Sequence, residues 1–245
     1  AALSWGHTQK LIAVVPNVPR PVRVRKGRQA KGRPITKEEY ERMLKKCPNP
    51  DWQRLLRGLW LSGFRLGEAL DFHWTDTARI RPIDVDDKRP MLVIPGESEK
   101  GNEDRLLPMT PDFAKMLRET PTKERQGFVF PLNGRKGRYT IDSTSARIVK
   151  IGKAANVVVH KTTKKTKFGS AHDLRRSFGD RWSRKVMPVV LQQLMRHESI
   201  ETTLKFYVGR DAEKLADELW AEERHVETQE HDTLHDTAKS ATDSA

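Results

Sequence analysis

The sequence predicts a mainly α-helical α+β domain that contains a small three-stranded antiparallel sheet. Helical patterns occupy most of the chain between residues 36 and 224. Between residues 79 and 108 they give way to short β segments, which Pro90, Pro95 and Gly96 separate. A chain of 245 residues has room for one substantial core and part of a second domain.

The N-terminal part predicts a helix end followed by a linker. In residues 1–15, Leu3, Trp5, Leu11 and Ile12 are candidate buried positions of one helix face. Residues 16–34 contain four prolines, two glycines and seven basic residues, with no acidic residue. This composition favours an extended interdomain linker that can follow a phosphate backbone.

The main domain is expected to begin near residue 35 and to end at residue 224. Thr36 is a good N-cap because Glu39 follows three residues later. Strands are expected at 79–85, 91–94 and 105–107, with Lys100 in a tight turn supported by Gly101-Asn102. Helices are expected at 36–46, 51–62, 66–73, 111–119, 142–154, 172–184, 188–195, 199–206 and 211–224. The acidic tail 225–245 has few apolar residues and is expected to be disordered.

The charge distribution favours a nucleic acid as partner. The formal net charge is +13, and residues 134–185 hold fifteen Lys and Arg against three acidic residues. We expect double-stranded DNA as the partner, with steeply salt-dependent binding. RNA binding, or a role of these charges in solubility alone, is the alternative. The side chains expected to contact the DNA backbone are Arg23, Arg25, Lys26, Arg28, Lys31, Arg33, Lys161, Lys164, Lys165 and Lys167.

Several classes of site and location are excluded or disfavoured. Cys47 is the only cysteine, so an internal disulfide and a cysteine-based metal site are excluded. No apolar stretch reaches the roughly 20 residues of a membrane span, and the N-terminal segment does not resemble a signal peptide. We therefore predict a cytoplasmic protein. There is no phosphate-binding Gly-rich loop, carboxylate cluster or His-Glu-x-x-His motif, so no metal and no cofactor are expected.

Residues that can handle a phosphodiester follow one another along the chain. His172 and Arg175 are three residues apart and share a helix face, so they can present an imidazole and a guanidinium to one anion. His197 and Tyr207 follow, ten residues apart. A tyrosine can attack a phosphodiester and store its bond energy covalently, provided that a base or cationic surroundings activate the phenol.

The ordered set resembles the tyrosine recombinase (phage integrase) family from about Thr36 to about Val208. The segment Gly63-Phe64-Arg65-Leu66-Gly67-Glu68 resembles the signature around the first catalytic arginine. The segment from Lys100 to Pro108 is similar to the lysine-bearing turn and the strand that follows it. His172-x-x-Arg175, Met195-Arg196-His197 and Tyr207 match the remaining boxes. Arg196 stands where members usually have glycine, and the interval from His197 to Tyr207 is ten residues rather than the common nine.

The resemblance implies a fold, a reaction and roles for these residues. The fold is the tyrosine-recombinase catalytic domain over residues 35–224, preceded by the remnant of a core-binding domain that is mostly absent from this chain. The reaction is DNA cleavage and rejoining through a 3′-phosphotyrosine, without metal or ATP. Arg65, Arg175 and His197 would bind the phosphate, His172 would accept a proton or orient the phosphate, Lys100 would act as general acid, and Tyr207 as nucleophile. Glu68 would hold the basic cluster.

The resemblance also implies a homotetramer on DNA, in prokaryotes or their phages, with directionality or DNA-bending proteins as further partners. Helix 211–224 is the candidate for packing into a neighbouring subunit. Two alternatives are a type IB topoisomerase-like enzyme and a DNA-binding relative that has lost catalysis. Individually, Lys100 also fits an ordinary turn lysine, and Tyr207 an apolar contact beside Phe206.

Overall fold

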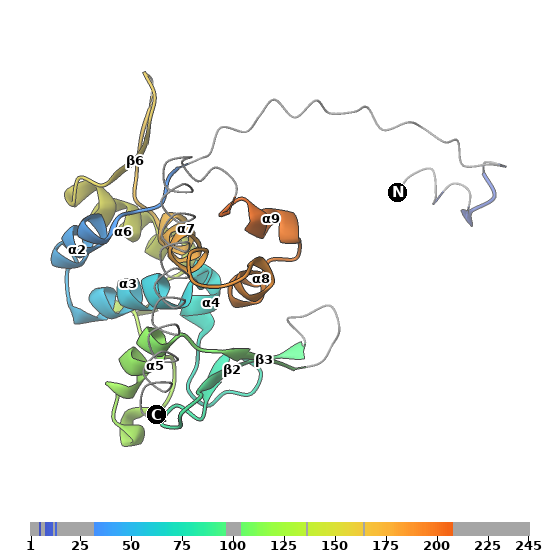
Figure 1. The fold of residues 1–245 in the computed structure, drawn as a ribbon, viewed down its shortest axis with the longest axis horizontal. Helices are drawn as coiled ribbons and strands as arrows, with labels where there is room; N and C mark the ends of the chain where they lie inside the picture. The colour runs from blue at the N-terminus through green and yellow to red at the C-terminus, as the bar shows by residue number, and fades with distance from the viewer. Residues whose placement is uncertain are drawn as a thin grey trace, which may run out of the picture. The chain divides into compact units, whose positions relative to one another are not determined.

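The computed structural model describes residues 5, 8–11, 13, 32–96, 104–135, 137–163 and 165–207. The chain divides into two units, Ala1–Lys31 and Gly32–Ala245. In the first unit the Gln9 N–H donates to the Trp5 carbonyl at 2.9 Å, which closes a single helical turn. The second unit is mainly helical, and its small sheet lies to one side of the helices (Figure 1).

The helices of the second unit lie close to their predicted positions. They are α2 (Lys37–Lys45), α3 (Pro50–Ser62), α4 (Leu66–Asp71), α5 (Pro111–Arg118), α6 (Ile141–Ala154), α7 (Ala171–Trp182), α8 (Pro188–Met195) and α9 (Ile200–Leu204), with a short 3-10 turn at Thr122–Glu124. Thr36 caps α2 through the predicted capping box with Glu39. The helix expected at 66–73 ends earlier, because Phe72 has an extended backbone.

The sheet has the order β1-β2-β3 and is antiparallel throughout. Its strands are β1 (Arg81–Ile83), β2 (Met91–Ile94) and β3 (Arg105–Pro108). β1 is shorter than the predicted 79–85, and Asp84, at a φ of 52°, turns the chain out of the strand. The register pairs Ile94 with Arg105. The tight turn predicted around Lys100 lies outside the described residues.

Two small hairpins were not predicted. One pairs β4 (Asn133–Gly134) with β5 (Gly137–Arg138), and the other pairs β6 (Val158–Lys161) with β7 (Thr166–Phe168). β6 points away from the helices (Figure 1). The exposed residues of the second hairpin are lysines and threonines, and Val159 is its buried anchor. A ribbon with so short an apolar pattern gives little periodic signal.

Two apolar clusters lie in the part of the chain that the structure describes. The larger one runs from Ile35 to Leu174 and includes Leu55, Leu56 and Leu59 of α3, all fully buried. The smaller one consists of Phe178, Leu191, Leu194 and Met195, against which Phe206 and Tyr207 pack while partly exposed. We call it the satellite cluster. Helix α3 packs along α7, which contributes to both clusters and so joins them.

The predicted fold class is confirmed: the second unit is a mainly helical α+β structure with a three-stranded antiparallel sheet. Helix 211–224, the tail 225–245 and most of residues 1–31 lie outside the described residues, so the domain boundaries predicted there stay predictions.

Candidate active site

The first turn of α7 is fixed by a buried carboxylate. Asp173 is fully buried and accepts from the Ser170 hydroxyl at 2.5 Å and the Ser170 N–H at 3.2 Å, in a capping box. Arg176 pairs with the same carboxylate at 2.6 Å and Lys167 at 3.4 Å. This arrangement sets the direction of the side chains that follow on the helix, including Arg175.

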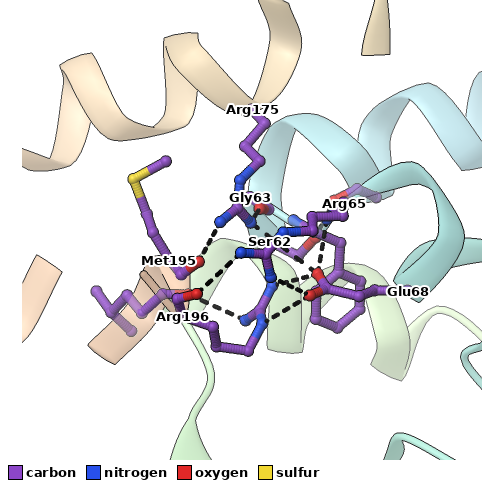
Figure 2. A network of polar contacts seen from close by, with 10 residues as sticks. Ser62, Gly63, Arg65, Glu68, Arg175, Met195 and Arg196 are labelled. Atoms are coloured by element: carbon purple, nitrogen blue, oxygen red, sulfur yellow. Dashed lines mark hydrogen bonds and ion pairs between the residues drawn. The ribbon is translucent and has the colours of Figure 1, made fainter. Parts of the chain in front are cut away.

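Arg175 lies between the ends of two other helices. Its side chain is almost entirely buried and donates to the carbonyls of Gly63 and Met195 (Figure 2). Gly63 is the C-cap of α3, and Met195 is the last residue of α8. Carbonyls at helix C-termini lack intrahelical donors and carry partial negative charge, so a buried guanidinium is well placed there.

Glu68 joins three arginines into one cluster. Its carboxylate accepts from the Arg65 N–H at 2.7 Å and the Arg65 guanidinium at 2.8 Å, and from Arg196 at 2.6 Å. Arg175 lies 4.0 Å from the same carboxylate. Figure 2 shows the three guanidinium groups gathered around Glu68. We call these four residues the guanidinium cluster.

The cluster carries more positive than negative charge. Burial alone would raise the pKa of Glu68, but the charge and hydrogen bonds of Arg196, with help from Arg65 and Arg175, lower it to about 2. Burial and the repulsion of Arg196 and Arg65 lower the pKa of Arg175 to about 9, against the attraction of Glu68. Glu68 and Arg175 are therefore both charged at neutral pH. Three arginines and one glutamate give the cluster a formal net charge of +2.

His197 lies within electrostatic reach of the cluster. Burial, then the charges of Arg175, Arg65 and Arg196, lower its pKa to about 4, so the imidazole is neutral at neutral pH. Its Nδ1 lies 2.9 Å from the Thr203 hydroxyl, and its ring stacks on Phe206. The turn after α8 that carries it is closed by a bond from the His197 N–H to the Gln192 carbonyl at 3.1 Å.

His172 lies at the exposed start of α7, one turn before Arg175. Its pKa is lowered, first by desolvation from the surrounding protein and then by the neighbouring charge of Arg176. The charge of His172 in turn contributes to the lowered pKa of His197. The structure thus brings Arg65, Glu68, His172, Arg175 and His197 together.

Tyr207 follows α9 and packs against the satellite cluster. Its hydroxyl donates to the carbonyl of Val186, in the connection between α7 and α8, at 2.6 Å. It reaches the same two helices that position Arg175 and His197, but its hydroxyl engages a backbone carbonyl in this arrangement.

The residues predicted to contact the DNA backbone divide into three groups. Lys161 and Lys165 are exposed on the hairpin of β6 and β7. Arg33 and Lys167 have intramolecular partners, since Arg33 forms a two-pronged bridge with Glu39 at 2.6 and 2.7 Å and Lys167 pairs with Asp173. The catalytic candidate Lys100 lies outside the described residues, as do Arg23, Arg25, Lys26, Arg28, Lys31 and Lys164.

Arg196 belongs to the cluster, although the sequence analysis gave it no role. It adopts a left-handed backbone at the end of α8, with φ and ψ both 51°. Its side chain is buried, donates to Glu68 and lies over the Phe64 ring at 5.0 Å. The available signal was the departure of Arg196 from the pattern that the resemblance implies for this position.

Within the described residues, no group of three or more His, Cys, Asp or Glu side chains is arranged to hold a metal ion. The same part of the chain contains no helix with the length and apolar character needed to cross a membrane.

Comparison with known proteins decides the family. The model of the phage integrase family matches residues 33–214, which is most of the chain. The chain belongs to the phage integrase family. A search of curated proteins finds no match to the sequence.

Solved structures of phage integrase family members share the fold. The crystal structure of XerA recombinase is 19% identical with a TM-score of 0.52, over 78% of this chain and 65% of XerA. The Tn1549 transposon integrase in complex with a circular intermediate DNA is 16% identical with a TM-score of 0.56, over 90% of this chain and 75% of the integrase chain. The integrase from mycobacterium phage Brujita is 22% identical with a TM-score of 0.50, over 84% of this chain and 62% of the Brujita integrase chain. The chain thus spans just under two thirds of XerA, and identities this low establish the fold alone.

Proposed function

We propose that this chain is the catalytic part of a site-specific DNA recombinase that cuts and rejoins strands through a covalent bond to Tyr207. The observation that carries the proposal is the guanidinium cluster, which keeps a surplus of positive charge beside His197 and next to the helices on which Tyr207 packs. Such a site suits an anion whose negative charge grows during the reaction.

In the proposed reaction the Tyr207 oxygen attacks the scissile phosphorus. A bond forms between phosphorus and the tyrosine oxygen, and the bond to the 5′-oxygen breaks. The phenol loses its proton to a base, for which His172 is the candidate, and Lys100 protonates the leaving 5′-oxygen. The 5′-hydroxyl of a second strand then reverses these steps, so the bond energy is conserved without ATP or a divalent metal.

The cationic residues have separate tasks in this proposal. Arg65, with half of its side chain exposed, would grip a non-bridging oxygen directly. Arg175 would stabilise the phosphate through its positive charge, because its guanidinium already donates to two backbone carbonyls. If the Thr203 hydroxyl donates to Nδ1 of His197, the other ring nitrogen carries the hydrogen and can donate to the phosphate.

Double-stranded DNA is the proposed substrate. The charge of the chain supports this, and solved relatives include the Tn1549 integrase with transposon right end DNA and XerH with its difH substrate. Lys161 and Lys165 are exposed and free to approach a phosphate backbone from the hairpin of β6 and β7. Exchange between two duplexes needs several active sites, so we propose a homotetramer on DNA, acting in the cytoplasm of a prokaryote.

Before attack, the Tyr207 hydroxyl has to leave the Val186 carbonyl, to which it donates at 2.6 Å. The exchange of the Val186 carbonyl for the scissile phosphate is a local change, because the Tyr207 side chain is only partly buried. DNA binding is the event that we expect to supply the competing acceptor.

The test is a trapping assay with nicked DNA from the attachment site of the element that encodes the protein. The protein is incubated with this DNA in EDTA and separated on a denaturing gel. We expect a slow-migrating protein–DNA adduct that disappears in Tyr207→Phe, while DNA affinity stays nearly unchanged. No adduct despite tight, salt-dependent binding would indicate a DNA-binding relative without catalysis, and relaxation of supercoiled DNA at sites of any sequence would indicate a topoisomerase-like enzyme.

A further inference from the structure

Arg196 occupies a backbone conformation that favours glycine. Its φ of 51° lies in the left-handed region, where a side chain costs free energy that glycine does not. Asp84 and Asn156 have similar angles, but aspartate and asparagine tolerate this region comparatively well. The contacts of the Arg196 side chain therefore have to offset the free-energy cost of this backbone conformation.

The side chain of Arg196 makes most of its hydrogen bonds to Glu68. It is buried, and its guanidinium donates to both carboxylate oxygens, at 2.6 and 3.3 Å. A third bond, at 3.0 Å, goes to the Leu194 carbonyl at the end of α8. The Arg196 carbonyl also accepts from Arg65 at 3.0 Å, so the residue contacts Arg65 through its backbone and Glu68 through its side chain.

Glu68 would otherwise compete with the substrate. Its carboxylate bonds the Arg65 guanidinium at 2.8 Å and lies 4.0 Å from Arg175, the two residues whose charge is proposed to stabilise the phosphate. Without Arg196, one negative charge would offset one of the two arginines. With Arg196 present, a net charge of +2 remains, equal to the charge of two arginines without a counterion.

We propose that Arg196 is a positioning residue of the strand-cleaving site, which occupies the Glu68 carboxylate and thereby leaves the charge of Arg65 and Arg175 to the phosphate. The inference rests on the proposed function and adds to it a residue to which the resemblance gave no role. The charge matters most when the phosphate becomes dianionic in the transition state, so Arg196 acts more on the rate of cleavage than on DNA affinity.

The experiment combines two substitutions in a double-mutant cycle. Arg196→Gly relieves the backbone and removes the guanidinium, and Glu68→Gln removes the carboxylate that it neutralises. We expect Arg196→Gly to lower the single-turnover rate of suicide-substrate cleavage about 10- to 100-fold, with DNA affinity changed less than about threefold. Arg196→Lys should recover part of the rate, because an ammonium can still neutralise Glu68. The double variant Arg196→Gly/Glu68→Gln should cleave faster than Arg196→Gly alone.

Asn156→Gly is the matched control, since it relieves a left-handed backbone at a loop outside the cluster. It should cleave at the wild-type rate. A wild-type rate in Arg196→Gly would overturn the proposal, as would a double variant slower than Arg196→Gly. A lower melting temperature of Arg196→Gly with an unchanged cleavage rate would also overturn the proposal, because Arg196 would then have a structural role alone.

A second readout does not depend on cleavage. In the Tyr207→Phe background, affinity is compared between DNA with the normal scissile phosphate and DNA with a neutral methylphosphonate there. Arg196→Gly should reduce the preference for the charged phosphate by about twofold, within the limit expected for its effect on DNA affinity. If the wild type forms no adduct, the proposed function fails while this preference still tests Arg196, and an unchanged preference overturns its role.

Discussion

The guanidinium cluster and the segment that carries Tyr207 are held in place by different means. The cluster lies at the junction of α3, α4, α7 and α8, where Arg175 bonds two helix ends and Glu68 bonds the other arginines. Phe64, beneath Arg196, belongs to the large core and is fully buried. Tyr207, by contrast, follows the five residues of α9 and packs on four residues of the satellite cluster.

This difference separates two requirements of the proposed chemistry. Electrostatic stabilisation works best when charges are fixed before the substrate arrives. The cluster provides this, because Glu68, Arg175 and Arg196 are largely buried and hydrogen-bonded to one another or to helix ends. A nucleophile has to move toward phosphorus and back, which a short helix on a small apolar cluster permits at lower cost.

Arg175→Lys should have the largest effect on cleavage. A lysine keeps the charge but cannot reach the Gly63 and Met195 carbonyls together, since both bonds come from the guanidinium fork. We expect single-turnover cleavage to fall about 100- to 1,000-fold with DNA affinity retained within severalfold. Arg57→Lys is the control, because Arg57 forms an exposed bridge with Glu119. Turnover near the wild-type level in Arg175→Lys would show that Arg175 is peripheral.

Leu191→Ala and Leu59→Ala should distinguish the two apolar clusters. Both side chains are fully buried, one in the satellite cluster and the other in the large core. Each truncation should lower the free energy of unfolding by about 2–5 kcal/mol. Leu191→Ala should in addition speed amide hydrogen exchange in α8 and α9 while α3 stays protected, and slow cleavage about tenfold through misplacement of Tyr207. Equal acceleration of exchange in all helices would mean that the clusters unfold as one.

The sequence was sufficient for the helices, the sheet and the grouping of the cationic residues. The helix cap at Thr36 and the change of periodicity near residue 79 are local signals, so they are readable without the fold. The ordered boxes around Arg65, Arg175 and His197 indicated the family, which the family match then confirmed.

The contacts of the site depend on long-range packing and could not be predicted in the same way. Arg175 binds carbonyls 112 and 20 residues away in the chain, and Glu68 meets Arg196 across 128 residues. The bridge between Arg33 and Glu39 likewise gives an intramolecular partner to a residue expected to contact DNA. The resemblance implied that Glu68 holds the basic cluster, but its bonds to Arg196 became visible only when α4 and the end of α8 were brought together.

Acid should weaken the tyrosine segment before it weakens the guanidinium cluster. The pKa of His197 falls from an ordinary value of 6.5 to about 4, whereas Glu68, at a pKa of about 2, stays ionised throughout that range. Between pH 4 and pH 6.5, His197 is protonated in the unfolded chain and neutral in the folded chain, so the unfolded chain binds more protons. The contribution of neutral His197 to stability is therefore complete above pH 6.5 and is lost as the pH falls toward 4.

We expect a loss on the order of 1–2 kcal/mol in the free energy of unfolding between pH 6.5 and 4, the smallest of the three effects, because His197 is only half-buried. Urea titrations at several pH values measure it, and His197→Gln should flatten the slope in that range. Because His197 stacks on Phe206, the amides of α9 should lose protection first as the pH falls. Loss of protection in α4 before α9 would contradict the prediction that acid weakens the tyrosine segment before the guanidinium cluster.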